Sequence, residues 1–161
     1  MVKAIIFDWG RTLFDSENSV LFPQTKQILE MMSQRYVLAI VSLASDGNVE
    51  KRKNIVCATE IETYFQSIRF SQTDKDSLYE STLVELALNP YEVAIVDDRI
   101  IRGIKWGNTR GAATIWLRKG KFAHEEPNED TGMPTYIIQN IGELCQLPLH
   151  EYRKNGDHKL I

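Results

Sequence analysis

The sequence contains few cysteines and no long apolar run, and each shortage excludes a class of protein. Only two of its 161 residues are cysteines, Cys57 and Cys145. Two cannot build a disulfide framework, which favours a reducing, cytoplasmic location. The longest apolar runs, such as 37–41 and 93–96, are far shorter than the roughly 20 residues that span a bilayer. The first residues lack an apolar stretch with a small-residue cleavage site, so we expect neither a signal peptide nor a membrane partner.

The sequence also lacks an excess of either charge sign. Lysine and arginine together number 19 and aspartate and glutamate 22, for a formal net charge of −3. Nucleic-acid binding depends on many cations that neutralise phosphates, so this balance gives no reason to expect a nucleic-acid partner. Apolar residues make up 43% of the chain and charged residues 25%, which is typical of a globular domain rather than a disordered chain.

Short apolar runs alternate with segments of helical spacing along the chain. Runs over 4–7, 36–41, 67–70, 93–96 and 113–117 have the length of strands buried on both faces, and a sixth run, 135–138, comes late. Between them, helical patterns cover about 23–35, 46–57, 78–87 and 100–111, with Asp46 as the expected N-cap of the second helix. Strands joined by helices pair in parallel through right-handed crossovers. We therefore predict a three-layer, doubly wound (Rossmann-like) α/β sheet, with residues 1–149 as a single domain and 150–161 as a polar C-terminal tail.

Polar side chains follow the predicted strands at the edge of the sheet where ligands bind in such folds. Asp8 follows the first strand, Ser42 the second, Lys75 opens the helix after the third, and Asp97 and Asp98 close the fourth. A carboxylate can act as a nucleophile and form a covalent intermediate. Two carboxylates can hold a hard divalent cation, while an ammonium and a hydroxyl can hold phosphoryl oxygens.

In order and spacing, these residues resemble the four motifs of the haloacid dehalogenase-like (HAD) superfamily, whose members are mostly phosphohydrolases. The resemblance covers roughly residues 3–120. It implies a strand order of 5-4-1-2-3, with the sixth strand beside the fifth. It also implies that Asp8 is the catalytic nucleophile and that Ser42 and Lys75 are its catalytic partners.

The same resemblance implies a bound Mg²⁺ ion. In the family the ligands are the nucleophile, the backbone carbonyl two residues later and an acidic residue of the fourth motif, which here correspond to Asp8, Gly10 and one of Asp97 and Asp98. The spacing to the end of the following helix favours Asp98 as the ligand.

The first motif departs from the family pattern at Gly10 and Arg11. Most family phosphatases carry an acid-base aspartate at the position of Gly10 and a glycine at that of Arg11. General acid-base catalysis is typically worth 10²–10⁴-fold. The resemblance therefore predicts a phosphatase-type hydrolase that favours leaving groups needing no proton, such as acyl and aryl phosphates. Trp9, Gly10 and Arg11 are candidate substrate-binding residues, although Trp9 is expected mainly to pack against the rim.

The spacing between the motifs leaves no room for an inserted cap domain. Residues 14–36 and 43–74 are largely filled by predicted helices and one strand. An open site can accept a small-molecule phosphate ester or a phosphorylated macromolecule. A neighbouring subunit of a homo-oligomer can also close it, and the loop 118–134 can cover part of it.

Two alternatives stay open. A non-catalytic regulatory domain that binds phosphate or a metal would explain the missing acid-base aspartate. Dehalogenase-type hydrolysis is the weaker alternative, because substitution at carbon has no need for the acidic pair Asp97 and Asp98 to hold Mg²⁺.

Overall fold

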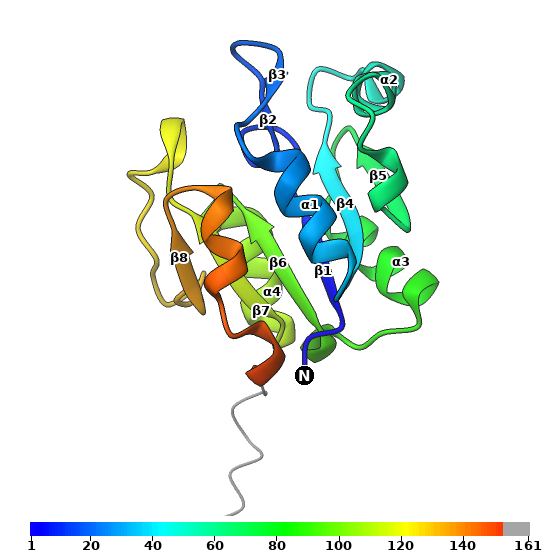
Figure 1. Ribbon diagram of the computed structural model, residues 1–161. Coiled ribbons are helices and arrows are strands. Elements are labelled where there is room, and N and C mark those ends of the chain that lie inside the picture. Colours follow the sequence, from blue (N-terminus) through cyan, green and yellow to red (C-terminus); the bar gives the residue numbers. More distant parts are fainter. Residues whose placement is uncertain (153–161) are drawn as a thin grey trace, which may run out of the picture.

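The computed structural model describes residues 1–152, which form one six-stranded parallel sheet with helices on both faces (Figure 1). All five neighbouring strand pairs are parallel. The strands lie in the order β5-β4-β1-β6-β7-β8. Their bounds are Ala4–Phe7 for β1, Val37–Leu43 for β4, Ser67–Ser71 for β5, Val93–Asp97 for β6, Ala113–Leu117 for β7 and Tyr136–Ile138 for β8.

The six predicted strands correspond, in chain order, to β1, β4, β5, β6, β7 and β8. The observed order therefore confirms the predicted doubly wound α/β sheet, with the sixth predicted strand beside the fifth. Central strand β1 pairs with β4 on one side and with β6 on the other. Its side chains alternate between two cores, because successive residues of a strand point to opposite faces. Ile5 and Phe7 belong to one core, and Ala4 and Ile6 to the other. The continuous apolar runs are therefore the signature of a sheet covered on both faces.

Two helices cover each face of the sheet. Helices α1 (Thr25–Ser33) and α2 (Val49–Ala58) pack into the core of Ile5, whereas α3 (Asp76–Leu86) and α4 (Lys105–Arg110) pack into that of Ile6. Short 3₁₀ turns occupy Glu62–Tyr64, Pro90–Glu92, Gly120–Phe122, Ile141–Gln146 and Leu149–Glu151.

The predicted cap of the second helix is wrong by two residues. Asn48, not Asp46, is the N-cap of α2, and its side chain accepts a hydrogen bond from the Lys51 amide at 2.9 Å. Asp46 instead accepts from the Asn48 amide and from Arg52. Both residue types cap helices well, so only the path of the loop decides between them.

A two-stranded hairpin, which the sequence pattern did not predict, lies between β1 and α1. It consists of β2 (Phe14–Asp15) and β3 (Val20–Leu21), and it projects beyond the carboxyl edge of the sheet (Figure 1). Strands of two residues are too short to show alternation of apolar and polar side chains.

The packed chain continues past the predicted domain boundary at residue 149, which falls inside the last 3₁₀ turn. Tyr152 packs against the core and donates a hydrogen bond to the Gly111 carbonyl at 3.3 Å. The remainder of the predicted tail, 153–161, lies outside the described residues. Within residues 1–152, no helix combines the length and apolarity needed to cross a membrane.

The segment after β6 begins with a π-helical turn, Ile100–Ile104, where the sequence predicts an ordinary helix. Such turns are rare and often lie at functional sites. Here the turn directs the Gly103 amide to the Asp97 carboxylate at 3.1 Å. A Cβ atom at Gly103 would collide with Asp97 Oδ2 and lie 2.6 Å from the Tyr79 hydroxyl. The turn therefore needs glycine at this position.

We predict that Gly103→Ala lowers the free energy of unfolding by about 1–3 kcal/mol, the usual cost of overpacking a core. Urea denaturation measures this change. The Tyr79 hydroxyl is buried and has no hydrogen-bond partner within residues 1–152. Tyr79→Phe should therefore restore part of the stability lost in Gly103→Ala, and equal stability of Gly103→Ala and the unchanged chain would contradict the crowding.

Candidate active site

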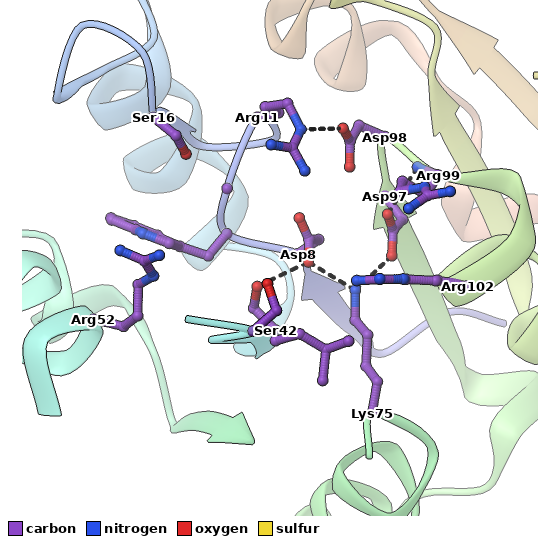
Figure 2. Close-up of a pocket in the computed structure, with 14 residues that line it drawn as sticks. Asp8, Arg11, Ser16, Ser42, Arg52, Lys75, Asp97, Asp98, Arg99 and Arg102 are labelled. Carbon is purple, nitrogen blue, oxygen red and sulfur yellow. Dashed lines mark hydrogen bonds and ion pairs between the residues drawn. The ribbon is translucent and has the colours of Figure 1, made fainter. Parts of the chain in front are cut away.

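The predicted catalytic residues meet where the carboxyl ends of β1, β4 and β6 lie side by side (Figure 2). Asp8 directly follows β1, Ser42 lies near the end of β4, and Asp97 and Asp98 are at the end of β6. Lys75 immediately precedes α3. All five side chains are buried. Buried polar and charged groups need partners, so the contacts among these residues are decisive for this part of the fold.

Lys75 joins two of the carboxylates. Its Nζ atom lies 2.7 Å from Asp8 Oδ1 and 2.6 Å from Asp97 Oδ2. Burial lowers the pKa of Lys75, but the charges of Asp8 and Asp97 outweigh it and hold the pKa well above its ordinary value. The Ser42 hydroxyl donates to Asp8 Oδ1 at 2.9 Å, and the Thr12 hydroxyl donates to Oδ2 at 3.2 Å. The Asp8 carboxylate is thus held at both oxygens beside the Lys75 ammonium.

Asp97 and Asp98 are neighbours in sequence but have different partners. Asp97 accepts hydrogen bonds from Lys75, from the Arg99 amide at 2.9 Å and from the Gly103 amide of the π-helical turn. Within residues 1–152, the carboxylate of Asp98 accepts only from Arg11, at 3.1 Å. Burial, with the charges of Asp8 and Asp97, raises the pKa of Asp98 to about 8, although Arg11 opposes the shift.

Asp8, Asp97 and Asp98 can bind a metal ion together. One oxygen of each lies within 4.8 Å of the others, and all three are buried. Carboxylate oxygens are the ligands that hard divalent cations such as Mg²⁺ prefer. The donor set fits such a cation, which would also offset the repulsion between these negative charges. Asp98 has fewer other partners than Asp97 and is therefore the freer ligand.

The three residues after Asp8 have distinct environments. The ring of Trp9 is buried and stacks on Phe14 at 5.0 Å, so it packs as expected, although the residue also lines the pocket. At Gly10, a Cβ atom would lie 3.2 Å from the Ser16 hydroxyl, and within residues 1–152 the pocket is lined by no carboxylate besides Asp8, Asp97 and Asp98. Arg11 adopts a φ of 65°, a left-handed conformation that favours glycine.

The loop 118–134 lies against this edge of the site. The Phe122 ring lies 4.7 Å from the Arg11 guanidinium and 3.9 Å from that of Arg99. Glu125 accepts from Arg99 at 2.8 Å and from the Ile100 amide at 2.7 Å. These contacts place the loop at the border of the pocket.

Several lining residues were not among the predicted site residues, namely Ser16, Leu43, Ser45, Arg52, Arg99 and Arg102. For two of them the sequence carries a signal, because Arg99 directly follows the acidic pair at a strand end and Arg102 lies three residues further along the chain. The sequence carries no such signal for Arg52, because the side of α2 on which Arg52 lies depends on the residue at which that helix begins.

Comparisons with known proteins find similarities to one family. Residues 75–144 match the family model described as HAD-hydrolase-like. A glyceraldehyde 3-phosphate phosphatase of Pyrococcus furiosus is 24% identical over 141 residues, covering 84% of this chain and 56% of that protein. The mitochondrial phosphatidylglycerophosphatase of Saccharomyces cerevisiae is 27% identical over 134 residues, covering 78% of this chain and 72% of that protein.

The fold has the same relatives. A haloacid dehalogenase-like protein of Streptococcus pneumoniae superposes with a TM-score of 0.75 at 17% identity, covering 90% of this chain and 97% of that one. The chain spans a little over half the length of the first curated relative. The matched segment, the curated relatives and the fold are thus all similar to proteins of the HAD-like superfamily.

Proposed function

We propose that this chain is a Mg²⁺-dependent phosphatase of the HAD type in which Asp8 is the nucleophile. The observation that carries the proposal is the surroundings of the Asp8 carboxylate. Lys75 and Ser42 bond one of its oxygens, and the acidic pair Asp97 and Asp98 lies alongside. A phosphoryl group on Asp8 would therefore meet one ammonium, one hydroxyl and the metal-binding carboxylates.

The reaction proceeds in two steps. In the first, an Asp8 oxygen attacks phosphorus, a new oxygen–phosphorus bond forms, and the leaving-group oxygen departs with its electron pair. In the second, water attacks phosphorus, the bond to Asp8 breaks, and inorganic phosphate leaves. Lys75 and Ser42 hold the phosphoryl oxygens in both steps, because donors fixed in advance stabilise charge as it develops.

Asp8, the backbone carbonyl of Gly10 and Asp98 would hold the Mg²⁺ ion. When bound, Mg²⁺ supplies charge neutralisation for the phosphoryl oxygens. Asp97, already bonded to Lys75 and two backbone amides, holds Lys75 and the π-helical turn in place.

The names of the curated relatives support phosphorylated small molecules as substrates. One is a glyceraldehyde 3-phosphate phosphatase and another a phosphatidylglycerophosphatase. Because Gly10 offers no acid-base group, this chain favours acyl and aryl phosphates, whose leaving groups need no proton. We also propose that it acts without a cap domain, since only the hairpin and α1 lie between β1 and β4.

We predict that the chain releases phosphate from acetyl phosphate when Mg²⁺ is present and stops when the metal is chelated. Asp8→Asn should reduce turnover to the level of buffer alone, because the amide is a poor nucleophile. Asp130→Asn, which changes an exposed carboxylate outside the pocket, is the matched control. Phosphate binding without turnover would favour the regulatory domain over the enzyme.

We also predict that Gly10→Asp raises the turnover of alkyl phosphates by about 10²–10⁴-fold, the usual worth of general acid-base catalysis. Turnover of acetyl phosphate should change little. The backbone of Gly10 is not left-handed, and the nearest obstacle to a side chain is the exposed Ser16 hydroxyl. Gly10→Asn supplies a side chain of the same size without the acid, and equal rates of the two variants would rule out proton transfer from position 10.

A further inference from the structure

The pocket contains more positive charge than its three carboxylates require. Its cations are Arg11, Arg52, Lys75, Arg99 and Arg102. Four of them have an acidic partner. Lys75 bonds Asp8 and Asp97, Arg11 bonds Asp98, Arg99 bonds Glu125, and Arg52 bonds Asp46 at 3.0 Å.

Arg102 is the exception. Within residues 1–152, its side chain makes no ion pair and no hydrogen bond, although it is partly buried and lines the pocket. A guanidinium carries five N–H donors and no acceptor, so it is suited to an anion. Nothing in the described protein supplies that anion.

The positions of Arg102 and Arg52 separate them from the nucleophile. Arg52 belongs to α2, which follows β4, and Arg102 belongs to the π-helical turn after β6. Since β1 lies between β4 and β6, the two arginines approach from opposite sides of Asp8 (Figure 2). Lys75 and Ser42 already bond Asp8 itself, which leaves the arginines for a part of the substrate beyond the transferred phosphoryl group.

We infer that Arg102, with Arg52 across the pocket, binds a second anionic group of the substrate. The substrates are then small phosphate esters that also carry a carboxylate or a second phosphate. This inference rests on the proposed phosphatase function. Arg102 is the principal contact, because Arg52 is already paired with an acidic side chain.

The experiment compares binding of three phosphonates, whose carbon–phosphorus bond this chemistry does not break. Propylphosphonate carries one anionic group, whereas 3-phosphonopropionate adds a carboxylate and 1,3-propanediphosphonate adds a second phosphonate. Calorimetry with Mg²⁺ present should show tighter binding of at least one doubly anionic ligand, by about tenfold or more, as expected for a charge-assisted contact. Whichever of the two doubly anionic ligands binds more tightly shows whether the second anionic group of the substrate is a carboxylate or a phosphate.

The measured quantity is the affinity of the better doubly anionic ligand divided by that of propylphosphonate. Arg102→Ala should bring this affinity ratio close to one, and Arg52→Ala should lower it less. Arg35→Ala, which removes an exposed arginine outside the pocket, controls for the change in net charge and should keep the ratio. Equal binding of all three ligands, or a ratio unchanged in Arg102→Ala, would overturn the second-anion site while leaving the proposed function intact. Failure of every phosphonate to bind, with no turnover of acetyl phosphate, would overturn both.

Discussion

The contact of Lys75 with Asp8 and Asp97 is the interaction on which the rest of the site depends. The ends of β1 and β6 bring three carboxylates into a buried space, and their repulsion opposes folding. Lys75 offsets two of these charges at 2.7 and 2.6 Å. Loss of one partner from a buried ion pair typically costs 3–5 kcal/mol, because the other charge stays buried and uncompensated. The same ammonium that permits this burial also lies beside Asp8, the proposed nucleophile, so one side chain would serve both stability and chemistry.

Around this centre, two segments of unusual backbone shape the pocket. Arg11 holds a left-handed conformation while bonding Asp98 and lying under Phe122, and the π-helical turn supplies an amide to Asp97. Non-glycine residues adopt such conformations at a cost of about 1–3 kcal/mol, and they persist where neighbouring contacts enforce them. Gly10 and Arg11, where the sequence departs from the pattern of the first motif, both line this pocket.

The sequence was sufficient to predict the sheet and the edge that carries the candidate site, because both follow from simple patterns. Fully apolar strands indicate burial on two faces, and parallel topology then brings Asp8, Ser42 and the acidic pair together. The remainder depends on geometry that no pattern records. The hairpin strands have two residues each, too few to show a pattern. The π-helical turn is as apolar as an ordinary helix. The side of α2 on which Arg52 lies depends on whether Asp46 or Asn48 is the N-cap of that helix.

A crystal structure with Mg²⁺ and beryllium fluoride, which mimics a phosphoryl group on aspartate, tests the central role of Asp8 most directly. The geometry predicts a fluoride adduct joined to the Asp8 carboxylate, with Lys75 and Ser42 donating to its fluorines and Mg²⁺ contacting Asp8 and Asp98. A well-ordered structure with no adduct on Asp8, or with the adduct on another side chain, would contradict nucleophilic catalysis by this residue.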